Sequence, residues 1–228
     1  MNTCQEKKIY ELAFKIETLY EDNSIPEREF ESLRQEIFSQ NLDFIHSVKE
    51  FSNKKEFFCF VFISFRASTY YFNKKYWSES KTLSQQMVEL SEDYSELYNL
   101  NLDSQDFYQY GLLWLSFSLM ELNKFKEAKK YLKELKEIGF KIEYAKRSIH
   151  QCDLALAFES LTTISYLSLL LFIPGSLYML AGKQIPLWAA YCTKIQIFIC
   201  VLVSLLYIYA HLYDKKTKNT TSLSISPF

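Results

Sequence analysis

The 228-residue sequence contains few of the residues that punctuate turn-rich folds, with only four glycines and four prolines. Because all-β sandwiches and barrels need such residues at their many turns, this scarcity disfavours them. The sequence also lacks a glycine-rich phosphate loop and the HExxH and GxSxG patterns. We therefore expect an all-α protein that is not an enzyme and holds no cofactor.

Cysteine and histidine are arranged without a metal-binding or disulfide pattern. The five cysteines include no CxxC pair, and their odd number does not fit a complete disulfide framework. His150 and Cys152 are two residues apart, so they face different sides of a helix. We expect no metal site and a reducing compartment. The N-terminal stretch has no basic region followed by an apolar run, which predicts no secretory signal.

Charge is distributed unevenly along the chain. Residues 1–159 hold 21 Lys/Arg and 26 Asp/Glu, whereas residues 160–228 hold five and one. An acidic first part argues against a broad nucleic-acid surface, because phosphate binding needs clustered Lys and Arg. The basic remainder suits the anionic inner leaflet of a membrane. The expected partners are therefore a lipid bilayer and another protein.

Apolar residues recur at helical spacing through the first part of the chain. Asn53 with Glu56 fits a helix N-terminus, and Gly139 fits a helix end. The run FFCFVFISF (57–65) is too short to span a bilayer and predicts a helix buried on most sides, although a place on a membrane surface stays open. The expected helices cover residues 5–20, 25–39, 41–51, 53–72, 77–97, a sixth that is capped by Asp103 and contains 111–122, then 125–138, and 141 onward.

One helical pair carries a family resemblance. Leu115, Ser116 and Leu119 on one helix, with Ala128 on the next, match the residues through which the two helices of a tetratricopeptide repeat approach each other. This stretch resembles one such repeat, and a poorer copy begins at Ala67. The resemblance covers about residues 56–154. It implies stacked antiparallel helical hairpins whose concave face binds a peptide or partner protein.

The resemblance also implies which side chains look into that face. They lie on the first helix of each repeat and are mostly apolar, so packing against a neighbouring helix is the main alternative. Arg66 is a cation among aromatic residues, and it either binds a carboxylate or points into solvent, the second being favoured. The expected groove residues are Phe65, Arg66, Thr69, Phe72, Asn73, Leu113, Phe117, Met120 and Glu121.

Two long uncharged stretches near the C-terminus predict a transmembrane helical hairpin. Residues 160–182 contain no charge over 23 residues and residues 195–213 none over 19. Each could cross a hydrocarbon core of about 30 Å as a helix. Lysines and Arg147 flank the pair, which places both termini in the cytoplasm. The expected domains are 1–159, 160–213 and a polar tail, 214–228, in an integral membrane protein of the bacterial inner membrane or, less favoured, a eukaryotic organelle.

Several residues of this hairpin have distinct expected roles. Pro174 and Gly175 predict a kink or break in the first span. Trp188 and Tyr191 suit a membrane interface, and Lys194 would lie at its boundary. Small and polar residues of the first span could line a helix interface or a lumen. These residues are Ser160, Thr162, Thr163, Ser165 and Ser168.

Two functions fit this sequence. The first is a membrane-anchored helical-repeat adaptor that holds a partner protein at the cytosolic face. The alternative is an oligomeric effector of a bacterial cell-suicide defence system, whose spans form a pore or perturb the bilayer. Oligomeric state separates them, since the alternative requires a homo-oligomer.

Overall fold

The computed structural model describes residues 3–180, and beyond them only positions 187, 191, 194, 195, 197–199, 201, 202, 204, 205, 208 and 209. Side chains are described up to residue 164, at residue 166 and at those later positions. The chain divides into two compact units, Met1–Cys152 and Asp153–Phe228. Each unit is described by itself.

The described residues form an all-helical, helical-repeat-like fold without strands. The all-α fold class predicted from the sequence is therefore confirmed. Seven α-helices and one short 3₁₀ helix follow one another in the described residues. Their bounds are α1 Thr3–Glu21, α2 Glu27–Ser47, α3 Lys54–Asn73, α4 Trp77–Asp93, η1 Leu102–Ser104, α5 Asp106–Glu121, α6 Phe125–Ile138 and α7 Ile142–Leu180.

Two helix ends follow from local chemistry, as expected. The Asn53 side chain accepts a hydrogen bond from the Glu56 backbone N–H at 2.9 Å, and Glu56 accepts one from the Ser52 N–H at 2.6 Å, which caps the start of α3. Gly139 has a φ of 88° after α6, a left-handed conformation that glycine adopts without steric cost.

The second helix differs from the prediction. Residues 25–39 and 41–51 were expected to form two helices, but α2 is continuous from Glu27 to Ser47. Asn41, expected to start the second of these, donates its side-chain amide to the Ile37 carbonyl at 2.8 Å, within the helix. Asn41 therefore bonds to a carbonyl of its own helix and does not end it.

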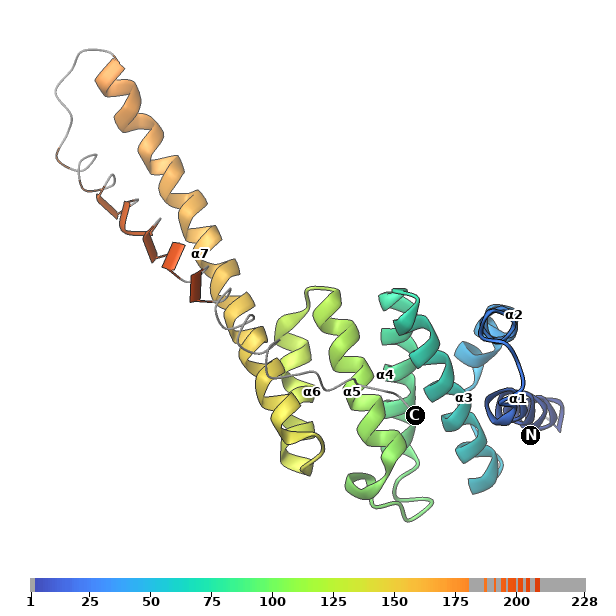
Figure 1. Cartoon of the computed structure of the whole chain (residues 1–228). Coiled ribbons are helices and arrows are strands. Elements are labelled where there is room, and N and C mark those ends of the chain that lie inside the picture. Colours follow the sequence, from blue (N-terminus) through green and yellow to red (C-terminus); the bar gives the residue numbers. More distant parts are fainter. Residues whose placement is uncertain are drawn as a thin grey trace. The chain divides into compact units, whose positions relative to one another are not determined.

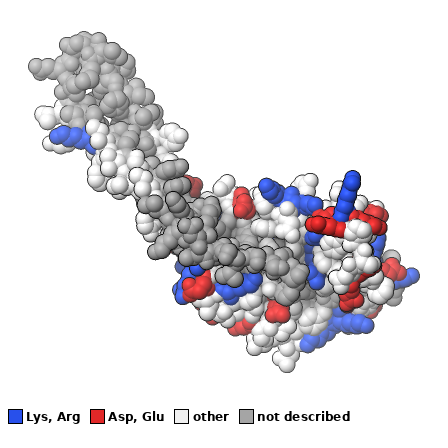
Figure 2. Space-filling model, in the orientation of Figure 1, with Lys and Arg blue, Asp and Glu red and all other residues white. Residues whose placement is uncertain are grey.

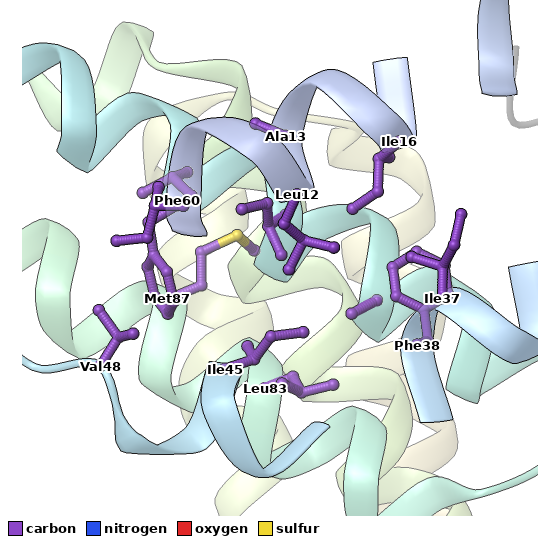
Figure 3. Packing of buried hydrophobic residues seen from close by; sticks show 14 of the residues in the cluster. Leu12, Ala13, Ile16, Ile37, Phe38, Ile45, Val48, Phe60, Leu83 and Met87 are labelled. Carbon is purple, nitrogen blue, oxygen red and sulfur yellow. The ribbon is translucent and has the colours of Figure 1, made fainter. Parts of the chain in front are cut away.

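The helices of unit 1 pack in two layers of hairpins. Helix α3 contacts α1, α4 and α5, while α5 contacts α4 and α6, so the odd-numbered helices α1, α3 and α5 lie side by side (Figure 1). Figure 3 shows side chains from α1 to α4 converging on one core. The labelled core residues are Leu12, Ala13, Ile16, Ile37, Phe38, Ile45, Val48, Phe60, Leu83 and Met87.

Small residues allow α4 and α5 to approach closely. The hydroxyl groups of Ser118 on α5 and Ser80 on α4 form a buried hydrogen bond of 2.9 Å. At Gly111 on α5, an added Cβ would lie 2.9 Å from the Met87 Cε and 3.1 Å from the Val88 Cγ2. A side chain at position 111 would require the flexible end of Met87 to shift and Val88 to move by a few tenths of an ångström, so glycine favours the close approach of the two helices.

Unit 2 is described mainly through the later part of α7. The hydroxyls of Ser160, Thr162 and Thr163 donate to carbonyls of the same helix three or four residues earlier. The backbone of α7 is helical through Pro174 and Gly175, so of the two expected alternatives, a kink or a break, the break is not seen. Large apolar side chains that are exposed in this unit include Ile164, Tyr166, Leu187, Ile195, Phe198 and Leu205.

The predicted membrane hairpin is wrong. In the part of the chain that the structure describes, no helix is both long enough and apolar enough to cross a membrane. Residues 160–180 of the first expected span continue the helix that begins at Ile142, as the expected helix from residue 141 onward implied. The part of α7 before residue 160 carries Glu143, Lys146, Arg147, Asp153 and Glu159.

The same finding corrects the predictions that depended on the hairpin. Of the second expected span, 195–213, the structure describes only residues 195, 197–199, 201, 202, 204, 205, 208 and 209. The predicted integral membrane location with both termini in the cytoplasm is withdrawn, since it required two spans. Both predicted functions required these spans. The binding of a partner protein is the part of them that does not depend on a membrane span.

We expect Gly111→Val to destabilise unit 1 by about 1–3 kcal/mol, because the added methyl groups collide with Met87 and Val88 across the α4–α5 contact. Chemical denaturation of the full chain measures this loss. Met87→Ala opens space beside the new side chain, so the double variant should lose less than the two single variants together, with a coupling of about 0.5–3 kcal/mol. Strict additivity would contradict the proposed contact.

Gly139→Ala is the matched control. Position 139 also favours glycine, but nothing lies within 4 Å of an added Cβ there. Gly139→Ala should destabilise the protein by about 1 kcal/mol through the positive φ alone. This loss should not couple with that of Met87→Ala.

Candidate functional site

The expected groove residues divide into buried and accessible ones. Thr69, Leu113 and Phe117 are at most 8 % exposed, and Phe72 packs on Trp77, Trp114 and Phe117. These four contribute to helix packing. Side chains that remain accessible are those of Phe65, Arg66, Asn73, Met120 and Glu121. Binding by these residues stays a prediction.

A groove lies elsewhere on the odd-numbered helices, between α1 and α3. It has a volume of about 560 Å³ and opens to solvent. Its wall is mostly apolar. The lining residues, which define the α1–α3 groove, are Ala13, Glu17, Lys54, Lys55, Phe58, Cys59 and Phe62.

Hydrogen bonds between α1 and the start of α3 hold one end of this groove. The Tyr10 hydroxyl donates to the Asn53 side-chain oxygen at 3.3 Å, and the Asn53 amide donates to Glu6 at 3.2 Å. The Lys55 ammonium lies 5.4 Å from the centre of the Tyr10 ring, a cation–π distance. The residue that caps α3 therefore also sets the position of α1 beside it.

Phe14 adds exposed apolar surface next to the groove. It follows Ala13 and precedes Glu17 by three residues, so it lies on the adjoining face of α1. Its side chain is 70 % exposed. Isolated apolar residues on a surface are common, but one beside an apolar groove enlarges the area available for binding.

At the far end of α3, a cluster around Arg34 joins α1, α2 and α3. Arg34 is 8 % exposed, and its guanidinium donates to Glu31 at 2.5 Å. Glu31 also pairs with Lys74 at 2.7 Å. The Arg34 guanidinium lies over three rings, those of Tyr20, Phe30 and Tyr70, at 5.3–5.6 Å. These six residues form the Arg34 cluster.

The Arg34 cluster lowers the pKa of the Glu31 carboxyl. Burial would raise its pKa, but the hydrogen bond from Lys74 and the charge of Arg34 outweigh this effect, and the pKa is lowered. Glu31 is therefore held in its charged form, in which it neutralises the buried Arg34.

Arg66 lies between the Arg34 cluster and the α1–α3 groove. Its guanidinium carbon is 4.2 Å from the centre of the Tyr20 ring and 5.4 Å from that of Phe62, which lines the groove. Among the described residues no carboxylate pairs with Arg66. Burial lowers its pKa; Tyr20 opposes this, and the positive Arg34 adds to it. Arg66 is therefore half-buried on aromatic rings instead of extending freely into solvent.

The surface charges in Figure 2 do not reveal this site. On the face shown, Lys/Arg and Asp/Glu side chains are intermingled. What distinguishes the cations near the α1–α3 groove is that all three lie on α3. Lys54 and Lys55 are at its start, and Arg66 lies three turns further on.

The residues predicted for the membrane hairpin belong to unit 2 and are described there by themselves. Thr163 is exposed, and its hydroxyl donates to the Glu159 carbonyl at 2.9 Å. Tyr191 is 61 % exposed, with the Lys194 ammonium 5.9 Å from its ring centre. Only the backbone is described for Ser165, Ser168, Pro174 and Gly175, and Trp188 lies outside the described residues.

One sequence feature could have indicated the groove, but it was interpreted as part of the packing between helical hairpins. On α3, Phe58, Phe62 and Phe65 form a second apolar stripe beside the buried one at Phe57, Phe60 and Ile63. One helix rarely needs two such stripes in a core. Phe14 likewise stands apart from the buried α1 stripe. The cluster partners of Arg34 carried no such local signal.

Among the described residues, no group of three or more His, Cys, Asp or Glu side chains is placed to hold a metal ion. The comparisons with known proteins give no further lead: no family model matches the chain, and no similar protein is found among curated proteins or solved structures. The predicted tetratricopeptide-repeat unit with a membrane hairpin is thus corrected to the coarser class of a helical-repeat-like, all-α protein.

We expect Glu31→Gln to destabilise the protein by about 1–3 kcal/mol at pH 7, because the buried Arg34 loses its charged acceptor. The pKa of Glu31 is lowered in the folded state, so its stabilisation is present above the unfolded-state value of about 4.3 and is lost as the pH falls through the folded value. Between pH 7 and pH 3, the free energy of unfolding should therefore fall less steeply in the variant than in the wild-type protein.

Glu11→Gln provides the comparison. Glu11 pairs with Lys7 at 3.6 Å, with both side chains more than 60 % exposed, and such pairs contribute about 0–1 kcal/mol. Equal losses in the two variants would show that the Arg34 cluster does not depend on its buried ion pair.

Proposed function

We propose that this protein is a helical-repeat adaptor that binds a helical segment of a partner protein in the α1–α3 groove. The observation that carries the proposal is the groove itself, an open, mainly apolar depression between two helices that are otherwise packed through Ile9, Leu12 and Ile16. An amphipathic helix fits such a groove by inserting apolar residues spaced three and four apart.

The shape of the groove supports a segment and not a small molecule. Its wall is formed by side chains along α3 from Lys54 to Phe62, about two turns of helix. Exposed Phe14 extends the apolar surface beyond the depression. A helix lying along α3 would cover both, whereas a compact ligand would leave Phe14 in water.

Cys59 gives a direct measure of occupancy. It lines the groove and is half-buried, and burial raises the pKa of its thiol. Its slow alkylation at pH 8 can be followed by mass spectrometry, with the exposed Cys4 as an internal reference.

We expect synthetic amphipathic peptides of about 18 residues to bind the full chain and to slow alkylation of Cys59 but not of Cys4. Fluorescence anisotropy gives their affinities. Phe14→Asp should weaken binding by at least about tenfold, since it places a charge on the apolar rim. Prior alkylation of Cys59 with a bulky maleimide should block binding altogether.

Tyr76→Asp is the matched control, because Tyr76 is also aromatic and 56 % exposed but lies at the turn between α3 and α4. It should leave the affinity unchanged. Failure of every peptide to bind would overturn the proposal. Concentration-dependent self-association that protects Cys59 without peptide would assign the groove to a second copy instead.

A further inference from the structure

We propose that the groove selects an acidic amphipathic helix and that Arg66 receives one of its carboxylates. This inference rests on the proposed function of the α1–α3 groove and names the chemistry of its occupant. It makes Arg66 a specificity-determining residue, while the apolar wall supplies affinity.

The first argument is the contrast between two neighbouring arginines. Arg34 has Glu31 as a carboxylate partner, and Glu31 is shared with Lys74. For Arg66, the structure shows no carboxylate partner and no hydrogen bond among the described residues. Its titratable neighbours are the positive Arg34 and the Tyr20 phenol, whose pKa is raised by burial and which is neutral near pH 7. The positive charge at Arg66 is therefore uncompensated within the described chain.

The second argument is the geometry of the guanidinium. The Arg66 Nε is buried without a hydrogen-bond partner, but neither terminal nitrogen is among the enclosed unpaired atoms. The planar group rests on Tyr20 at 4.2 Å, so its terminal N–H groups remain available while its orientation is restricted. A carboxylate that accepts from two such N–H groups meets a donor that has already lost much of its freedom.

The third argument is charge complementarity along α3. Lys54 and Lys55 line the groove near the start of the helix, and Arg66 lies eleven residues beyond Lys55, about 16 Å along the axis. Glu17 is the acidic lining residue between them. A helix with acidic side chains three turns apart and apolar residues between them would satisfy both positive ends.

The test compares peptides of about 18 residues that share one apolar stripe. The first has a Glu at each end of the stripe, the second and third have one Glu changed to Gln at either end, and the fourth has both changed. We expect the doubly acidic peptide to bind wild-type protein about 10–100 times more tightly than the neutral one, with the difference shrinking as salt is raised.

A double-mutant cycle assigns the carboxylate to Arg66. Arg66→Gln should weaken the doubly acidic peptide about 10–100-fold and have no effect on the peptide that lacks the Glu at its end of the groove. Lys55→Gln is the matched control and should couple with the opposite Glu. Arg66→Lys keeps the charge but loses the planar fork, so it should recover only part of the affinity.

The outcomes separate this inference from the proposed function. If all four peptides bind equally and Arg66→Gln changes none of them, the groove stands and the acidic occupant is overturned. If none binds, the groove function itself fails. Thermal unfolding of Arg66→Gln checks folding, and equal loss of the acidic and neutral peptides would assign Arg66 a structural role only.

Discussion

The close packing of α3, α4 and α5 is the constraint on which the rest of unit 1 depends. Buried small residues make this packing possible, as in the contact of Gly111 with Met87 and the hydrogen bond between Ser80 and Ser118. Helices joined through small side chains gain close van der Waals contact over their whole length. Large aromatic residues of α3 fill the remaining space between the helices, as Phe72 does in its contacts with Trp77 of α4 and Trp114 of α5.

Aromatic side chains of α3 meet α5 and also border the α1–α3 groove. Phe65 contacts Tyr110 and Phe72 contacts Trp114, both on α5. Phe58 and Phe62 line the groove, to which α1 contributes Ala13 and Glu17, and Phe58 also contacts Phe107 of α5. The groove thus combines aromatic side chains of α3 with a short apolar side chain of α1.

Local signals predicted the helices well and their relations less well. The ends at Asn53 and Gly139 depend on neighbouring residues alone, and the structure places them as expected. The division at Asn41 was wrong because the asparagine bonds back to its own helix. The membrane hairpin was wrong because the absence of charge over 19 to 23 residues was taken as sufficient for a span, whereas no described helix is both long enough and apolar enough to cross a membrane.

The candidate site was less accessible to such reasoning, since it combines residues that are distant in the chain. Tyr20, Arg34 and Arg66 lie on three different helices, and their meeting follows from how α1 and α2 pack on α3. Sequence could identify Arg66 as a cation among aromatic residues. It could not indicate that the nearby Glu31 is already engaged by Arg34 and Lys74.

That division of roles between the two arginines has a physical consequence for recognition. A buried ion pair that is complete, as at Arg34, fixes the orientation of the three helices but offers little to a ligand. An arginine held on the same Tyr20 ring without a carboxylate has lost part of its hydration and gained no partner. It therefore gains more from an incoming carboxylate than a freely hydrated arginine would, because part of the cost of removing its water was met when the protein folded. The aromatic cluster thus holds the helices together and keeps one charge ready for binding.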